Sequence, residues 1–154
     1  MKNLFVYLSL FFAIVSTASG QSTADRKSFN LDKSGLAIEG YDPVAYFNSG
    51  KAKEGKKEIN SVLGGVTYRF SSMANREQFK ANPAKYQPQY GGWCAYAMGK
   101  DGEKVSVDPE TFKVLNGKLY LFYNRFFTNT LKDWNKNEAN LKAKADQNWS
   151  KINP

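Results

Sequence analysis

The stretch Glu58–Phe70, EINSVLGGVTYRF, decides the fold class of this chain. Its two halves, EINSVL and VTYRF, favour β-strands joined across Gly64-Gly65, a dipeptide typical of two-residue hairpin turns. Apolar and polar residues alternate in the second half. Because neighbouring strand residues point to opposite faces of a sheet, we expect one face to be buried, formed by Val66, Tyr68 and Phe70.

A second hairpin is indicated further along the chain, with strands at residues 112–115 and 119–123. Asn116-Gly117 between them is the strongest short signal for a type I′ turn. Asp108-Pro109 predicts a turn or a helix cap before this hairpin.

Helices are expected around the first hairpin. Asp42-Pro43 is a helix-start signal, so one helical turn should run through Tyr46 or Phe47. Ser71 or Ser72 should cap a second helix at residues 73–81, which ends at Asn82-Pro83 because a residue before proline avoids the α region. We expect the inward-facing residues of this helix to be Met73 and Phe79.

The C-terminal part repeats apolar residues at helical spacing. Leu131 and Trp134 share one face, and the later stripe of Leu141, Ala145 and Trp149 follows a candidate cap at Asn137. The predicted fold is therefore α+β: small antiparallel β-hairpins packed with short helices and a C-terminal amphipathic helix.

Residues 1–20 have the features of a secretory signal peptide. Lys2 precedes an apolar run at residues 4–15, and Ala18-Ser19-Gly20 supplies small residues for cleavage before Gln21. The run is shorter than the ~20 residues of a membrane span, so we expect export to the periplasm or the outside of the cell, without integral membrane anchoring. An uncleaved N-terminal anchor is the alternative.

The rest of the chain has the length of one domain. Residues 21–34 are polar and expected to be loose, and one domain should follow at residues 35–150. The formal charge is +8, or +7 without Lys2, the only charged residue before Gln21. In an exported protein this charge suggests solubility or contact with anionic surfaces, and no nucleic-acid partner.

The chain has one cysteine, Cys94, and no histidine. Ser-His-Asp and Cys-His catalysis are therefore excluded, as are histidine-ligated metal sites. A single cysteine cannot form an internal disulfide or resolve one, which disfavours a thiol oxidoreductase. We expect a protein that is not an enzyme.

Several short motifs follow one another in a fixed order along the chain. They are GYDPVAYF at 40–47, YRFSS at 68–72, NREQF at 75–79, ANPAKY at 81–86, YGGWCA at 90–95, Asp108-Pro109, GKLYL at 117–121 and ADQNW at 145–149. In combination this order resembles the exported, longer branch of the YHS-domain family. The resemblance implies a small α+β domain of a family often associated with metal handling, copper especially.

The resemblance also implies where a family metal site would lie. In the short metal-binding members, cysteines follow Asp-Pro-Val and flank the start of the next helix. The matching positions are Ala45, Ser71 and Asn75, and none of them carries a thiolate. The family's thiolate site is therefore not retained in this chain.

The leading hypothesis for a site is copper binding centred on Cys94. Cys94 and Met98 are four residues apart and would share one face of a helix, and Met73 is a possible third ligand. Thiolate and thioether groups suit Cu(I). The alternative for the methionines is that they fill gaps in the core.

The second hypothesis is a pocket for an aromatic or apolar ligand, with haem the less favoured occupant. Its candidate residues are all aromatic: Tyr86, Tyr90, Trp93, Tyr96 and Tyr120. The alternative is that these rings form part of the hydrophobic core. The function expected from the sequence is thus an exported, non-enzymatic binding protein, metal-binding or else a small-ligand or protein-interaction module with a structural Cys94.

Overall fold

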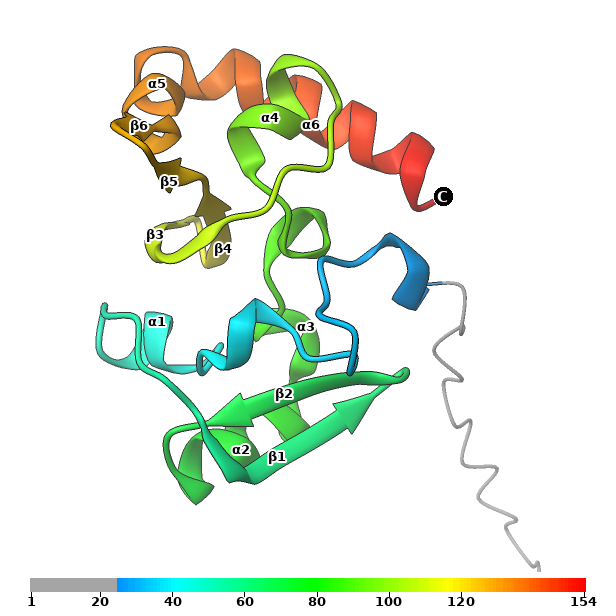
Figure 1. Ribbon diagram of the computed structural model, residues 1–154, viewed down its shortest axis with the longest axis vertical. Helices are drawn as coiled ribbons and strands as arrows, with labels where there is room; N and C mark the ends of the chain where they lie inside the picture. The colour runs from blue at the N-terminus through cyan, green and yellow to red at the C-terminus, as the bar shows by residue number, and fades with distance from the viewer. Residues whose placement is uncertain (1–24) are drawn as a thin grey trace, which may run out of the picture.

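The computed structural model describes residues 25–154, which form the α+β fold that the sequence predicts (Figure 1). Three antiparallel sheets of two strands each are packed with short helices, and the longest helix lies at the C-terminal end. Within residues 25–154, no helix combines the length and apolar character needed to cross a membrane. The signal peptide predicted at residues 1–20 lies outside the described residues.

One end of the molecule is built on the first hairpin, β1 (Lys56–Leu63) and β2 (Val66–Phe70), which turns at Gly64-Gly65 as predicted. The predicted face is confirmed, since Val66, Tyr68 and Phe70 are at most 3% exposed. Two short helices, α1 (Ala45–Asn48) and α3 (Pro83–Tyr86), lie between this hairpin and the other end of the molecule (Figure 1).

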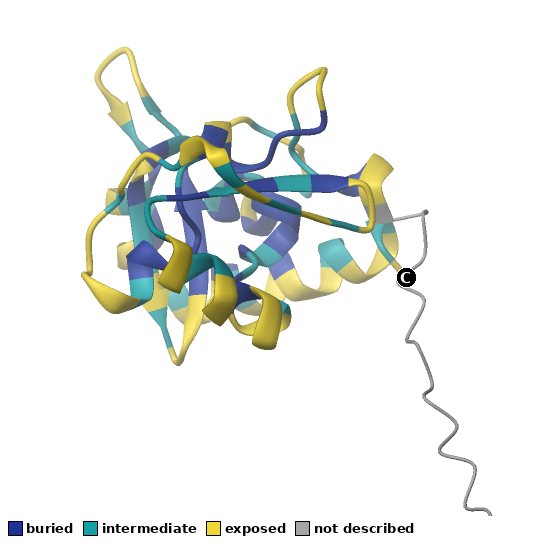
Figure 2. Cartoon of the chain, turned by 90° about the horizontal axis from the view of Figure 1, so that it is seen from below, coloured by how far each residue is buried: buried dark blue, intermediate teal, exposed yellow. Residues whose placement is uncertain are grey.

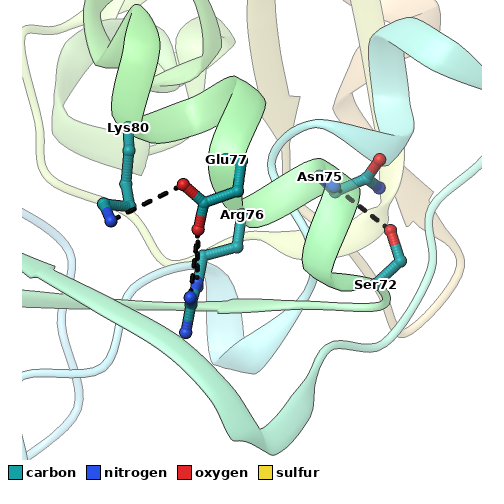
Figure 3. A network of polar contacts seen from close by, with 5 residues as sticks. All are labelled: Ser72, Asn75, Arg76, Glu77 and Lys80. Atoms are coloured by element: carbon teal, nitrogen blue, oxygen red, sulfur yellow. Dashed lines mark hydrogen bonds and ion pairs between the residues drawn. The ribbon is translucent and has the colours of Figure 1, made fainter.

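Helix α2 (Met73–Ala81) has the predicted bounds and begins at Ser72, whose Oγ accepts the Asn75 N–H at 3.2 Å (Figure 3). Its outer face carries Arg76, Glu77 and Lys80, where the two cations pair with the carboxylate. Phe79 is buried, but Met73 is 51% exposed, so its predicted inward orientation is wrong. At 100° per residue the two side chains are about 120° apart around the helix, and only one can face the sheet.

The other end is built on β3 (Asp108–Leu115) and β4 (Lys118–Phe122). Asn116 and Gly117 have φ of 51° and 72°, as a type I′ turn requires. Asp108 and Pro109, where the sequence predicts a turn or a cap, both belong to β3, and Asp108 pairs with Phe122. Asp108 Oδ1 nevertheless accepts the Glu110 N–H at 3.0 Å, the side-chain contact of an Asx turn. The register of the pair shifts between Asp108 and Phe112, as it does at a β-bulge.

Helices α4 (Ala95–Lys100), α5 (Thr130–Lys136) and α6 (Glu138–Ile152) cover this second end (Figure 1). Helices α4 and α6 cross very closely. A Cβ added at Gly99 of α4 would overlap the carbonyl oxygen of Leu141 in α6. A residue without a side chain is therefore what lets the two backbones meet.

A third hairpin, not expected from the sequence, consists of β5 (Asn124–Arg125) and β6 (Thr128–Asn129). It leaves the end of β4 and leads directly into α5. Its two-residue turn is Phe126-Phe127.

Three 3-10 turns complete the part of the chain that the structure describes: η1 (Asp25–Ser28), η2 (Ile38–Gly40) and η3 (Gln89–Gly92). Residues 21–34 are expected from the sequence to be loose, but the part of this segment that the structure describes is hydrogen-bonded to η3 and to the adjacent Trp93. The Trp93 indole donates to the Ser28 carbonyl at 2.7 Å, and the Asn30 N–H donates to Gly91 at 2.8 Å. From Ser28 onward this segment is therefore hydrogen-bonded to the rest of the domain.

Buried residues form two clusters, and exposed residues lie on the outer helix faces and loops (Figure 2). The first cluster joins the two hairpins and includes Tyr46, Tyr68, Phe70, Phe79, Cys94, Leu119 and Leu121. The second cluster lies under α4, α5 and α6 and includes Tyr90, Met98, Tyr120, Phe122, Trp134 and Ala145. The C-terminal apolar stripe predicted from Leu141 and Ala145 thus packs in the core.

Candidate functional site

Cys94 lies directly before α4 and exposes none of its surface. Its N–H donates to the Val105 carbonyl at 2.9 Å, which ties the start of α4 to the segment leading into β3. Its Sγ accepts the Tyr123 N–H at 3.4 Å and lies 3.4 Å from Thr130 Oγ1. The thiol is therefore fixed by both ends of the β5–β6 hairpin.

The hydrogen bonds of Thr130 indicate how the thiol is arranged. The Thr130 hydroxyl donates to the Tyr123 carbonyl at 3.0 Å, so its single hydrogen is already used. The contact with Cys94 is then a thiol donating to Thr130 Oγ1.

A hollow with a volume of about 210 Å³ opens beside Cys94. Two of its lining residues, Cys94 and Thr130, are buried, and its half-buried lining includes Tyr96 and Tyr123. Ala97 and Val105 complete the apolar part. The hollow thus has aromatic and apolar lining over a buried thiol.

Three charged and exposed residues line the hollow: Lys100, Asp101 and Glu103. Lys100 and Asp101 pair at 3.2 Å, and the hydrogen bond to Asp101 raises the pKa of the lysine. Glu103 is in none of the ion pairs formed by residues 25–154. The lining therefore offers one uncompensated negative charge.

The predicted metal ligands lie in three different surroundings. Cys94 packs in the first cluster, Met98 packs in the second, and Met73 is exposed at the start of α2. Met98 does not line the hollow, although its N–H donates to the Cys94 carbonyl. Cys94 is the cap residue of α4, and despite the four-residue spacing the two side chains pack in different clusters. Within residues 25–154, no three Cys, Asp or Glu side chains form a group able to hold a metal ion.

The five predicted pocket aromatics do not form one pocket. Only Tyr96 lines the hollow. Tyr86 packs in the first cluster, Tyr90 and Tyr120 pack in the second, and the Trp93 indole is bonded to Ser28. Tyr90 and Tyr120 have ring centroids 5.8 Å apart, so most of this aromatic set is core packing.

The three positions matched to the family's cysteines converge on Asp42, a residue that the sequence indicated only as a helix cap. Asp42 is fully buried. Its Oδ2 accepts the Ser71 N–H at 2.8 Å, the Ser71 hydroxyl at 2.7 Å and the Asn75 amide at 2.7 Å. Its Oδ1 accepts the N–H groups of Val44 at 2.8 Å and Ala45 at 3.3 Å. Hydrogen bonds thus occupy both oxygens, and we call this group the Asp42 network.

Sequence reasoning missed Tyr123, Thr130 and Glu103 as lining residues of the hollow. No spacing links them to Cys94, because tertiary contacts bring them together. For the Asp42 network the sequence does carry a signal, since Ser71 and Asn75 are two of the positions matched to the family's cysteines.

Comparisons with protein-family models, with curated proteins and with solved structures give no match to this chain. The resemblance to the YHS family therefore rests on the motifs, and the function must be argued from the site.

Proposed function

We propose that this chain is a non-enzymatic binding protein whose ligand occupies the hollow beside Cys94. The observation that carries the proposal is the meeting of two tyrosine side chains, a buried thiol and an unpaired carboxylate around one cavity. Small-molecule sites combine apolar and aromatic walls with a few polar groups that fix orientation.

The lining favours a small aromatic amine as the ligand class. Its ring would pack against Tyr96 and Tyr123, and its ammonium group would be attracted by Glu103 and by the tyrosine faces. An anionic ligand would be repelled by the same carboxylate.

The volume limits the size of the ligand. Benzene fits an enclosed cavity of ~150 Å³, whereas sites for drug-sized ligands run to roughly 300–1,000 Å³. A hollow of about 210 Å³ suits one ring with a short side chain. Haem is larger than this space and is the less favoured occupant.

The test compares phenethylamine with phenylacetate, which share a ring and differ in charge, by NMR titration of the protein. We expect a Kd of about 1 mM for the amine and binding about fivefold weaker for the acid. Glu103→Gln should remove most of this difference. Glu58→Gln, which removes an exposed charge on β1, should leave it unchanged.

A second pair of variants tests whether the amine binds in the hollow. Ala97→Phe fills the hollow and should abolish binding of the amine, whereas Ala139→Phe on the exposed face of α6 should not. Unchanged binding in Ala97→Phe would contradict the proposal.

Copper is a second candidate, favoured by the position of the Cys94 sulfur at the hollow. Cu(I) accepts soft ligands in small number. The thiol would have to lose its proton and its buried side chain would have to move toward the ion. Titration with Cu(I) of the wild type, Cys94→Ser and Met98→Leu tests this, and equal affinities in all three would rule it out.

We also propose that the protein acts after export, on the basis of residues 1–20. Mass spectrometry of protein recovered from the periplasm or the medium should find Gln21 as the first residue. Recovery with residues 1–20 still attached would contradict this part of the proposal.

A further inference from the structure

The turn of the β5–β6 hairpin combines an unfavourable backbone with exposed apolar rings. Phe126 and Phe127 have φ of 51° and 67°, in the left-handed region that bulky residues avoid. The same chain uses Asn116-Gly117, with φ of 51° and 72°, for the β3–β4 turn. The hairpin thus has the backbone of an Asn-Gly turn with two phenylalanines in it.

The two rings have no role in the core. Phe126 is 87% exposed and Phe127 is fully exposed, at a nominal 112%, the two highest exposures among large hydrophobic residues at positions 25–154. Neither belongs to the first or the second cluster. Turn geometry and packing both leave this pair of residues unexplained, which points to a contact outside the chain.

The hairpin is anchored at its base, so the rings are presented on a structured support. The Thr130 N–H donates to the Tyr123 carbonyl at 3.0 Å, and the Asn124 amide donates to Thr111 Oγ1 at 2.9 Å. Arg125 pairs with Glu39 at 3.5 Å across to η2. We call the Phe126-Phe127 turn the knob. Because its support is structured, it loses little conformational freedom when it inserts into a partner.

The charge of the protein indicates what the knob contacts. The chain has 22 Lys and Arg against 14 Asp and Glu. Lys132, five residues after Phe127, is exposed and takes part in none of the ion pairs of residues 25–154. Basic side chains beside inserted apolar groups strengthen binding to anionic lipid.

We propose that Phe126 and Phe127 insert into the interfacial region of an anionic lipid bilayer. A bilayer accepts two adjacent rings without a complementary pocket, and its negative surface matches the excess of cations. Two rings give weak and reversible binding, as a single acyl chain does. The site is separate from the hollow, although Tyr123 and Thr130 connect the two.

The experiment measures co-sedimentation of the full-length protein with vesicles of phosphatidylcholine and phosphatidylglycerol at a 7:3 ratio. The test variant is Phe126→Asn with Phe127→Gly, which keeps the turn type and removes both rings. Because both proteins share the same N-terminus, their difference reports the turn. We expect the variant to partition about tenfold more weakly, with a melting temperature unchanged or raised.

Two further measurements separate the contribution of charge to lipid binding from that of ring insertion. Lys132→Glu should weaken binding to the anionic vesicles about threefold and leave binding to pure phosphatidylcholine unchanged. In Phe126→Trp, brominated lipids should quench more fluorescence than in the wild type. Equal partitioning of wild type and turn variant would overturn the proposal, as would a turn variant that changes only self-association in sedimentation velocity, which would make a second copy the partner.

Discussion

The two clusters of the core handle their polar groups in opposite ways. The first cluster draws a carboxylate inside, where Asp42 is fully buried and accepts hydrogen bonds on both oxygens. In the second cluster, the polar groups of the aromatic rings donate hydrogen bonds to carboxylates nearer the surface. There the Trp134 indole donates to Glu138 at 2.9 Å, and the Tyr90 hydroxyl donates to Asp146 at 2.8 Å.

The difference shows where each end of the molecule is vulnerable. A buried charge is tolerated only while its hydrogen-bond partners are present. The stability of the first cluster therefore depends on which residues hydrogen-bond to Asp42. In the second cluster the half-exposed Asp146 is also bonded to Lys142 at 2.7 Å, and water can replace a lost partner. Ring volume should therefore matter more than polarity there.

The largest expected effect comes from Asp42→Ala. It leaves the N–H groups of Val44 and Ser71 without their acceptor inside the protein, so we expect a loss of about 3–5 kcal/mol in the free energy of unfolding. Asp32→Ala is the matched control, because Asp32 also accepts two backbone N–H groups but in a turn near the surface. Chemical denaturation measures both, and similar losses would remove the contrast between buried and exposed carboxylates.

The next effect tests ring volume in the second cluster. Trp134 is fully buried against Tyr120 and Phe122. Trp134→Phe should cost about 2–3 kcal/mol, mainly because it opens a cavity that the neighbouring rings fill only in part, and to a smaller extent because it removes the hydrogen bond to Glu138. Tyr120→Phe removes only the hydroxyl and should cost less than about 1 kcal/mol in the same denaturation experiment. A larger loss for Tyr120→Phe would mean that polarity, not volume, controls this cluster.

A smaller effect isolates one hydrogen bond of the Asp42 network. Ser71→Ala removes a hydroxyl that donates to the carboxylate at 2.7 Å and should cost about 1.5 kcal/mol. Ser49→Ala removes a hydroxyl that donates to a neutral carbonyl at 2.8 Å and should cost about half as much. Equal losses would show that the charge of Asp42 adds nothing to its hydrogen bonds.

The smallest expected effect depends on pH and belongs to the second cluster alone. The hydrogen bond from Lys113, together with that from Trp134, lowers the pKa of Glu138 below its ordinary value of 4.5. A carboxyl group with a lowered pKa stabilises the folded state above its unfolded pKa, and this stabilisation is lost as the pH falls through the folded value. Since the pair is partly exposed, the contribution is at most about 1 kcal/mol.

Melting temperatures of the wild type and Glu138→Gln should therefore converge as the pH falls from about 6 to about 3. Glu58→Gln, on the exposed face of β1, serves as the control and should follow the wild type across the range. A constant difference between wild type and Glu138→Gln would show that the carboxylate charge is not the cause.

Local signals in the sequence predicted the hairpins and helix bounds well. Gly64-Gly65 and Asn116-Gly117 marked two turns, and Ser72 with Asn82-Pro83 marked both ends of α2. These signals work because they depend on backbone preferences of adjacent residues. The third hairpin escaped because Phe126-Phe127 has no such preference for a turn.

The candidate site was less predictable, because long-range contacts create it. Cys94 was singled out from the sequence, yet its partners Tyr123 and Thr130 are 29 and 36 residues away. Met98 follows Cys94 closely and nevertheless packs in the other cluster. Spacing along the chain alone does not decide which of the two clusters a side chain enters.

The close crossing of α4 and α6 at Gly99 has a consequence for sequence variation. In a library of random substitutions, position 99 should tolerate no replacement, because even alanine would push α6 away at Leu141. The exposed positions of α6, such as Ala139 and Lys144, should accept most residue types. Among proteins that share this fold, an invariant glycine at this crossing would identify α6 as an integral part of the domain even where the rest of the helix has diverged.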